Sequence, residues 1–139
     1  MTLRVACDTN VLVSAFIAAG PPSRVLEEAI DGRLKFALLS PAMVELERIL
    51  TGKLGFEPER WHAVEDLLVS LAADLAPAPS SPPEAVTGDP ADDLILACAI
   101  EVEVNVLVSG DRRHLLSVGK RRCVRVITPQ ALLAELRGV

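Results

Sequence analysis

Residues 4–16 read RVACDTNVLVSAF and contain the pattern that decides the fold. Residues 4–7 are typical of a buried strand, and the residues from Asn10 onward carry apolar side chains at helical spacing. Asp8 stands between these two apolar segments, where both neighbours predict burial. A buried charge has a high free-energy cost unless it is paired or bound to a ligand, so Asp8 is the first candidate functional residue.

The composition predicts one globular domain spanning residues 1–139. Hydrophobic residues make up 50% of the chain and charged residues 24%, which is typical of such domains. No apolar segment is long and uninterrupted enough to span a membrane, and no secretory signal is visible. The three cysteines, Cys7, Cys98 and Cys123, are odd in number and lie among aliphatic residues. This pattern favours reduced thiols in a cytoplasmic protein over disulfides or a zinc site.

Several classes of active site lack their usual residues. The two histidines, His62 and His114, are isolated in the sequence, so a zinc centre or a Ser-His-Asp triad has few candidate ligands or catalytic groups. No glycine-rich phosphate loop or nucleophile elbow is present.

The charge of the chain is unevenly distributed. The net charge of −5 argues against nonspecific binding to nucleic acid. However, residues 111–125 hold six of the fourteen basic residues. This segment is either a solvated face or a local phosphate-binding strip, and the sequence leaves both interpretations open. The six residues are Arg112, Arg113, Lys120, Arg121, Arg122 and Arg125.

Strand and helix patterns alternate along the chain. Strands are predicted at residues 3–8, 34–39, 105–109 and 123–128, with a brief strand near Leu75. Helices are predicted between and after them. This order indicates a parallel sheet covered by helices on both faces, in three layers. In such sheets, binding sites form beyond the carboxyl ends of the strands.

Two acids follow predicted strands. Asp8 ends the first strand, and Asp111 follows the strand at residues 105–109 in the turn SGDRR. The carboxyl ends of parallel strands lie at one edge of the sheet, so the two carboxylates converge if the strands are neighbours. The alternatives are a helix N-cap for Asp8 and a simple turn residue for Asp111.

A third acid lies in the predicted helix at residues 40–53. Glu45 is placed at the border of the apolar stripe of this helix, whereas Glu47 lies about 200° around the axis and should face water. We expect Glu45 to point towards the sheet. The alternative is a glutamate at the boundary that reaches solvent.

The fourth acid comes from residues 89–96, which read DPADDLIL. Asp89 as N-cap and Asp92 in the first turn are explained by the start of a helix, where the macrodipole favours acids. Asp93 is less well explained, because it heads an apolar stripe formed by residues 96, 97 and 100. Asp93 is therefore the fourth candidate.

Four gathered carboxylates need a cationic partner. Two carboxylates about 4 Å apart repel by roughly 4 kcal/mol at an effective dielectric of about 20. An all-oxygen cluster is the ligand set of Mg²⁺ or Mn²⁺, and water bound to such ions becomes a nucleophile at lower pH than free water. This chemistry suits phosphodiester hydrolysis.

The motifs that carry these acids resemble those of the PIN domain family, close to prokaryotic VapC-like toxin components of toxin–antitoxin pairs. Residues 8–15, DTNVLVSA, resemble the opening motif, and Glu45 falls on the helix glutamate of the family. Residues 92–99, DDLILACA, resemble a D-x-x-I-A pattern that we assign to Asp93 as the third acid. Residues 107–115, LVSGDRRHL, place Asp111 as the fourth.

The resemblance implies a three-layer α/β/α sandwich around a parallel five-stranded sheet. It also implies a metal-dependent endoribonuclease for single-stranded RNA, with Asp8, Glu45, Asp93 and Asp111 as catalytic residues and ligands of Mg²⁺ or Mn²⁺. Further implications are a small antitoxin partner and a homodimer. The supporting or substrate-binding residues are then Asn10, Ser109, Arg112 and Arg113.

One departure from the family pattern is visible. Many relatives carry a further acid two residues after the fourth, where this chain has Arg113, which puts a full second metal site in question. An inactive PIN-like module that binds RNA or protein is therefore the alternative function. A phosphohydrolase of the haloacid dehalogenase type would need a second acid at the position of Asn10.

Overall fold

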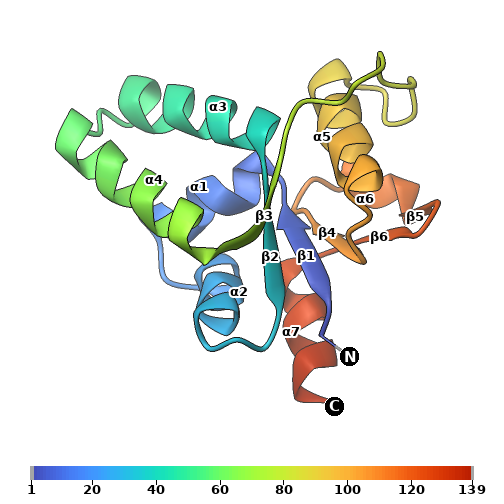
Figure 1. Ribbon diagram of the computed structural model, residues 1–139, viewed down its shortest axis with the longest axis horizontal. Helices are drawn as coiled ribbons and strands as arrows, with labels where there is room; N and C mark the ends of the chain where they lie inside the picture. The colour runs from blue at the N-terminus through green and yellow to red at the C-terminus, as the bar shows by residue number, and fades with distance from the viewer. Residues whose placement is uncertain (1, 139) are drawn as a thin grey trace.

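The structure of the protein, a computed structural model, describes residues 2–138. Within these residues, six strands form one sheet in the order β3-β2-β1-β4-β6-β5 (Figure 1). Five of these strands are parallel, as predicted, and β5 pairs antiparallel with β6 at the edge. The strands are β1 (Arg4–Cys7), β2 (Lys35–Leu39), β3 (Ala72–Ala76), β4 (Val106–Val108), β5 (Lys120–Arg121) and β6 (Val124–Ile127).

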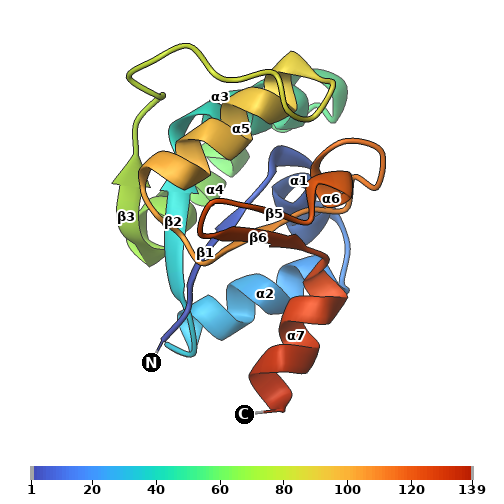
Figure 2. The ribbon, with the colours of Figure 1, turned by 90° about the vertical axis from the view of Figure 1, so that its right-hand side faces the viewer.

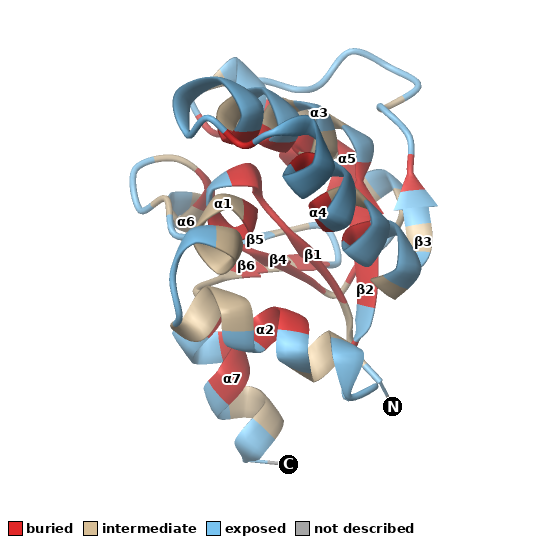
Figure 3. Cartoon of the chain, turned by 90° about the vertical axis from the view of Figure 1, so that its left-hand side faces the viewer, coloured by how far each residue is buried: buried red, intermediate tan, exposed pale blue. Residues whose placement is uncertain are grey.

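Helices cover both faces of the sheet, so the predicted α/β/α class is confirmed. Figures 2 and 3 show α3, α4 and α5 on one face and α2 and α7 on the other. Helix α1 packs against both α2 and α3. The helices are α1 (Thr9–Ile17), α2 (Pro21–Ile30), α3 (Ser40–Arg48) with a π-helical turn (Ile49–Lys53), α4 (Pro58–Leu71), α5 (Pro90–Glu101), α6 (Leu115–Val118) and α7 (Pro129–Arg137).

The central strands explain why residues 4–16 decide the fold. All three residues of β4 are buried, as are the last three of β1, because helices cover the sheet on both faces. A strand of this kind carries a continuous apolar run and shows no alternation of polar and apolar side chains. Figure 3 shows these strands in the buried layer between the two sets of helices. The core therefore lies on both faces of β1 and β4.

The sequence did not predict the sixth strand. Residues 120–121 fold back onto β6 through a tight turn in which Arg122 has a φ of 53°. Positive φ is usually supplied by glycine, and the turn between Arg121 and Val124 contains none, so the usual hairpin signal is absent. β3 is also longer than the brief strand expected near Leu75.

No helix within residues 2–138 combines the length and the apolar character needed to cross a lipid bilayer.

Candidate active site

The register of β1 and β4 brings Asp8 beside Ser109. Cys7 pairs with Val108, so the next residue of each strand lies at the same edge of the sheet. The buried Ser109 hydroxyl donates to Asp8 Oδ2 at 2.6 Å and accepts from the backbone N–H of Asp111 at 3.0 Å. Ser109 therefore links the two acids at the point where the strand order changes direction, which is where sites form in sheets of this kind.

Asp8 serves both as a helix cap and as a member of this cluster. Its Oδ1 accepts from the backbone N–H of Val11 at 3.0 Å, which caps α1, while Oδ2 holds Ser109. The side chain is nearly inaccessible, with an exposed fraction of 3%. Burial raises the pKa of Asp8, and the negative charges of Asp111 and Glu45 raise it further. The hydrogen bonds from Ser109 and Val11 lower the pKa, but they do not cancel the rise. Both acids therefore lie close enough to act on Asp8.

Glu45 and Asp92 line a small cavity with Asp8. This cavity has a volume of about 60 Å³, and Asn10 also borders it. Glu45 comes from α3, which follows β2, and Asp92 comes from the first turn of α5. Because α5 leads into β4, it begins at the carboxyl edge of the sheet. Three acids from separate elements therefore meet at the same place.

The carboxyl groups of Asp92 and Asp111 interact with each other, and this interaction favours one proton on the pair. Burial raises the pKa of Asp92 to about 7, together with this interaction and the charges of Asp89, Asp111 and Asp8. Burial alone would also raise the pKa of Asp111, but backbone N–H groups of Arg113 and His114 and the interaction with Asp92 lower it. We therefore place the shared proton on Asp92.

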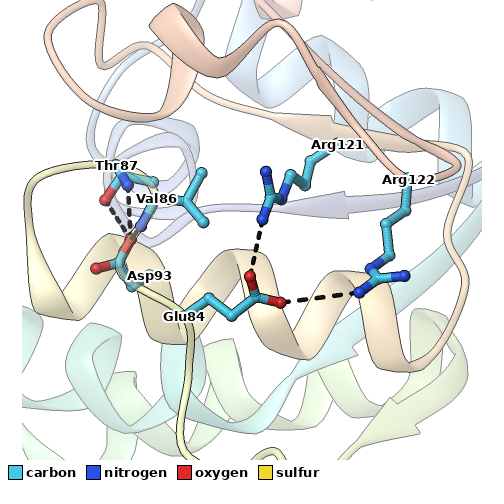
Figure 4. A network of polar contacts seen from close by, with 6 residues as sticks. All are labelled: Glu84, Val86, Thr87, Asp93, Arg121 and Arg122. Atoms are coloured by element: carbon cyan, nitrogen blue, oxygen red, sulfur yellow. Dashed lines mark hydrogen bonds and ion pairs between the residues drawn. The ribbon is translucent and has the colours of Figure 1, made fainter.

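The structure places Asp93 outside this cavity, whereas Asp92 lines it. Its Oδ1 accepts three hydrogen bonds, from the backbone N–H of Val86 and from the N–H and hydroxyl of Thr87, at 2.7–3.0 Å. Figure 4 shows Asp93 turned towards these loop residues. Although burial alone would raise the pKa of Asp93, these hydrogen bonds lower it. Asp93 therefore anchors the loop before α5.

Helix geometry explains why Asp92 takes the place expected for Asp93. Consecutive residues lie about 100° apart on a helix, so the two acids point to different faces. Asp93 shares the stripe of Leu96 and Ile100, which lines a cavity beneath the loop. Asp92 lies three residues before the buried Ile95, so the D-x-x-I spacing itself identifies Asp92. This spacing was the sequence signal that could have found it.

In the part of the chain that the structure describes, the acids have few cationic partners. Within residues 2–138, no lysine or arginine forms an ion pair with Asp8, Asp92 or Asp111, and Glu45 has a weak contact of 3.9 Å with Arg48. Several carboxylates at one place without neutralising side chains are unfavourable unless they bind protons or a cation. The all-oxygen donor set fits Mg²⁺ or Mn²⁺.

The predicted supporting residues lie along a neighbouring cleft. Asn10, Arg112 and Arg113 border this cleft of about 790 Å³, and so does Asp111. Both arginines are exposed, and the backbone N–H of Arg113 donates to Asp111 Oδ1 at 3.0 Å. The cleft therefore joins the acids to the basic residues that follow them in the chain.

His114 is isolated in the sequence, but in the structure it lies beside two acids. One ring nitrogen of His114 and one carboxylate oxygen from each of Asp89 and Asp92 lie within 4.8 Å of one another. The backbone N–H of His114 also donates to Asp111 Oδ1 at 3.2 Å. Sequence reasoning missed this histidine because its neighbours come from α5, more than 20 residues earlier in the chain.

The fold and this edge define a class of protein, an α/β/α sandwich with a carboxylate cluster at the carboxyl ends of its strands. The chain belongs to the PIN domain family, whose model matches residues 4–113. This match confirms the family resemblance of the motifs, and it excludes the dehalogenase type. PIN domains are in general nucleases and typically bind divalent metal ions.

Comparisons with individual proteins support the fold. The chain is similar to a solved structure titled "Crystal Structure of FitAcB from Neisseria gonorrhoeae", with a TM-score of 0.59 and 19% sequence identity. The similarity covers 91% of this chain and 98% of that chain, and at this identity it shows the fold alone. No curated protein matches the chain significantly.

Proposed function

We propose that the protein is a Mg²⁺- or Mn²⁺-dependent endoribonuclease that hydrolyses phosphodiester bonds in single-stranded RNA. The observation that supports this function is the gathering of Asp8, Glu45, Asp92 and Asp111 at one edge, where only Glu45, among residues 2–138, has an arginine contact, with Arg48 at 3.9 Å. The nuclease character of the PIN domain family agrees with this chemistry.

The four acids would hold the cation. Asp8 is fixed by Ser109 and by the N-cap hydrogen bond, so its remaining lone pairs have a defined direction. The Asp92–Asp111 pair must release its shared proton before both carboxylates bind a cation. A divalent cation bound there would stabilise charge on the phosphate oxygens and lower the pKa of a coordinated water.

The cleft beside the acids is the proposed substrate-binding surface. Arg112 and Arg113 line it and supply charges for phosphate groups, while Asn10 and Gln130 offer amide groups to bases or sugars. Aromatic residues make up 3% of the chain, so stacking platforms for bases are scarce. Binding therefore depends mainly on phosphate contacts.

The wider biological setting is part of the same proposal. The VapC-like motifs imply a toxin of a toxin–antitoxin pair that acts in the cytoplasm as a homodimer. A small antitoxin would then cover the acid cluster. Co-expression with the product of a neighbouring small gene tests this setting, because suppression of RNA cleavage and a stable complex are expected.

Substitution of Asp8 by asparagine tests the nuclease. Asp8→Asn keeps an oxygen to cap α1 but removes a charge from the cluster, so we expect at least about a 100-fold loss of Mn²⁺-dependent cleavage of single-stranded RNA. Glu47→Gln is the matched control, because Glu47 is an exposed acid on α3, two residues from Glu45. Undiminished cleavage by pure Asp8→Asn protein would end the proposal.

An inactive module that binds RNA or protein is the second candidate. Arg113, in the place of the further acid of many relatives, is the observation that favours it. Calorimetry with Mn²⁺ and a cleavage assay on unstructured RNA separate the two functions. The inactive module should bind RNA without metal and yield no RNA fragments. The nuclease should bind Mn²⁺ at the acids and cleave the RNA.

A further inference from the structure

We propose that Arg121 and Arg122 form a phosphate-binding subsite for one nucleotide of the RNA strand, and that Glu84 occupies this subsite in the free protein. The inference rests on the proposed function, because it extends the path of the same substrate beyond the cleft. It assigns a role to basic residues of the β5–β6 hairpin, which the acid cluster and the cleft do not use.

One carboxylate joins the two arginines. Glu84 Oε2 lies 2.9 Å from Arg121 Nη2, and Glu84 Oε1 lies 3.8 Å from Arg122 Nη2, so each oxygen faces a different guanidinium group (Figure 4). A phosphate group also presents several anionic oxygens, and arginine is the side chain best suited to bind them. The Glu84 carboxylate therefore lies where a phosphate of the substrate would bind.

The backbone of the hairpin turns both arginines to the same side. Consecutive side chains of a regular strand point to opposite faces of the sheet. Arg122 follows the last residue of β5 and has a φ of 53°, in the left-handed region that residues with a side chain rarely adopt. This turn breaks the alternation, so the hairpin presents two guanidinium groups to one anion.

The contacts of Glu84 are weak enough to be exchanged. The side chains of Glu84 and Arg122 are 65% and 67% exposed, and ion pairs at such exposure contribute little to stability. Arg125 differs, because it makes two hydrogen bonds of 3.0 Å to Glu135. An RNA strand already bound in the cleft presents its next phosphates at a high effective concentration. Such a strand can therefore displace Glu84.

A cavity beside the arginines has room for a nucleotide. Its volume is about 360 Å³, which is in the range of small-ligand sites. Leu96, Ala97 and Ile100 of α5 supply an apolar lining, and both arginines of the subsite also border the cavity. A base can therefore lie against the apolar side chains while its phosphate faces the guanidinium groups.

The cavity continues the path of the substrate from the cleft. His114 borders the cleft, and its Nδ1 lies 3.1 Å from the carbonyl oxygen of Thr87. Thr87 follows Val86, which lines the cavity. The cavity runs along α5 from Asp93 to Glu101, about 12 Å of helix. A few nucleotides span this length, since each rises about 3.4 Å in a stacked strand.

Binding of single-stranded oligouridylate tests the subsite, in the Asp8→Asn protein so that the RNA stays intact. Joint substitution of Arg121→Ala and Arg122→Ala should weaken binding about tenfold and reduce the slope of log Kd against log salt by about 0.7. Arg24→Ala with Arg33→Ala is the matched control, because it removes the same charge at exposed positions in and after α2. An equal loss in both double variants, or no loss in either, would overturn the subsite.

Glu84→Gln tests the occupancy by the carboxylate. It removes the competing charge, so RNA should bind about two- to fivefold more tightly, whereas Glu59→Gln, at an exposed position of α4, should have little effect. In the protein that lacks both arginines, Glu84→Gln should no longer strengthen binding. An equal gain with and without the arginines would overturn the proposal, because it would reflect net charge alone. Tighter binding of polyglutamate than of oligouridylate by the Glu84→Gln protein would also overturn it, in favour of an acidic peptide.

Cleavage separates this inference from the nuclease. Both arginines reach the surface, and the midpoint of thermal unfolding checks that each variant is folded. An active nuclease whose RNA binding ignores the arginine and Glu84 substitutions would reject the subsite alone. A chain that never cuts RNA, but whose RNA binding responds to these substitutions as expected, would reject the nuclease alone.

Discussion

At the level of single residues, the shared proton of Asp92 and Asp111 links this site to pH. Burial and the neighbouring acids raise the pKa of Asp92 from its ordinary value of 3.8 to about 7. A carboxyl group whose pKa is higher in the folded state binds its proton more tightly there than in the unfolded chain. Protonation therefore favours folding, and the contribution of Asp92 falls as pH rises from about 4 to about 7.

We predict that the metal-free protein loses stability across this range of pH. In a chelating buffer, the midpoint of thermal unfolding should decrease from pH 5 to pH 8, and the decrease should be smaller in Asp92→Asn, which cannot ionise. Added Mn²⁺ should raise the midpoint more at pH 8 than at pH 5, because protons compete with the ion. Parallel curves for the two proteins would show that Asp92 has an ordinary pKa.

At the level of elements, the end of the segment between β3 and α5, at Val86 and Thr87, is held by one buried carboxylate. Asp93 accepts hydrogen bonds from Val86 and Thr87, whereas Glu84 forms exposed ion pairs with Arg121 and Arg122 (Figure 4). Exposed ion pairs contribute about 0–1 kcal/mol, but a buried donor left without its partner costs about 1–3 kcal/mol. Asp93 should therefore dominate the attachment of this loop.

Adjacent substitutions on α5 test this division of roles. Asp93→Ala should lower the free energy of unfolding by about 1–3 kcal/mol and speed hydrogen exchange at the amides of Val86 and Thr87. Asp92→Ala, the matched neighbour, should have a smaller effect on the metal-free protein, because it also removes repulsion among the acids. Denaturant unfolding measures both effects, and an unchanged Asp93→Ala protein would contradict the anchoring role.

At the level of the whole molecule, charge is segregated in a way that the net value of −5 conceals. Acids occupy the carboxyl edge of the sheet. Arg112 and Arg113 come directly after Asp111 in the sequence and line the same cleft. A surface that is acidic on average can therefore still bind phosphate locally. The acids themselves repel RNA unless a cation neutralises them.

This distribution predicts a salt-dependent contribution of the cleft arginines. In an Asp8→Asn background, which stops cleavage, Arg113→Ala should weaken binding of single-stranded RNA similarly for all sequences and reduce the slope of log Kd against log salt by about 0.7. Arg33→Ala is the control, because Arg33 is paired with Glu28 before β2, at the amino end of the sheet. An unchanged slope in Arg113→Ala would remove this residue from the binding surface.

The sequence by itself determined the layers of the fold and the position of two of the acids. Strands buried on both faces need continuous apolar runs, and the local patterns around residues 4–7 and 106–108 show them directly. Asp8 and Asp111 come after these apolar segments in the sequence. Because the two strands are parallel, both acids lie at the carboxyl edge of the sheet. The sequence did not predict the sixth strand, because the turn at Arg122 contains no glycine.

Only the tertiary structure decided which acid of α5 faces the cluster and which residues join it. Buried residues lie on several sides of α5, so its sequence does not fix its rotation. Helix α5 packs between the sheet and the loop that precedes it. In this orientation Asp92 points towards the acid cluster, and Asp93 binds the loop. His114 and Asp89 meet for the same reason, since contacts between segments distant in the chain depend on how whole elements pack and leave no local pattern.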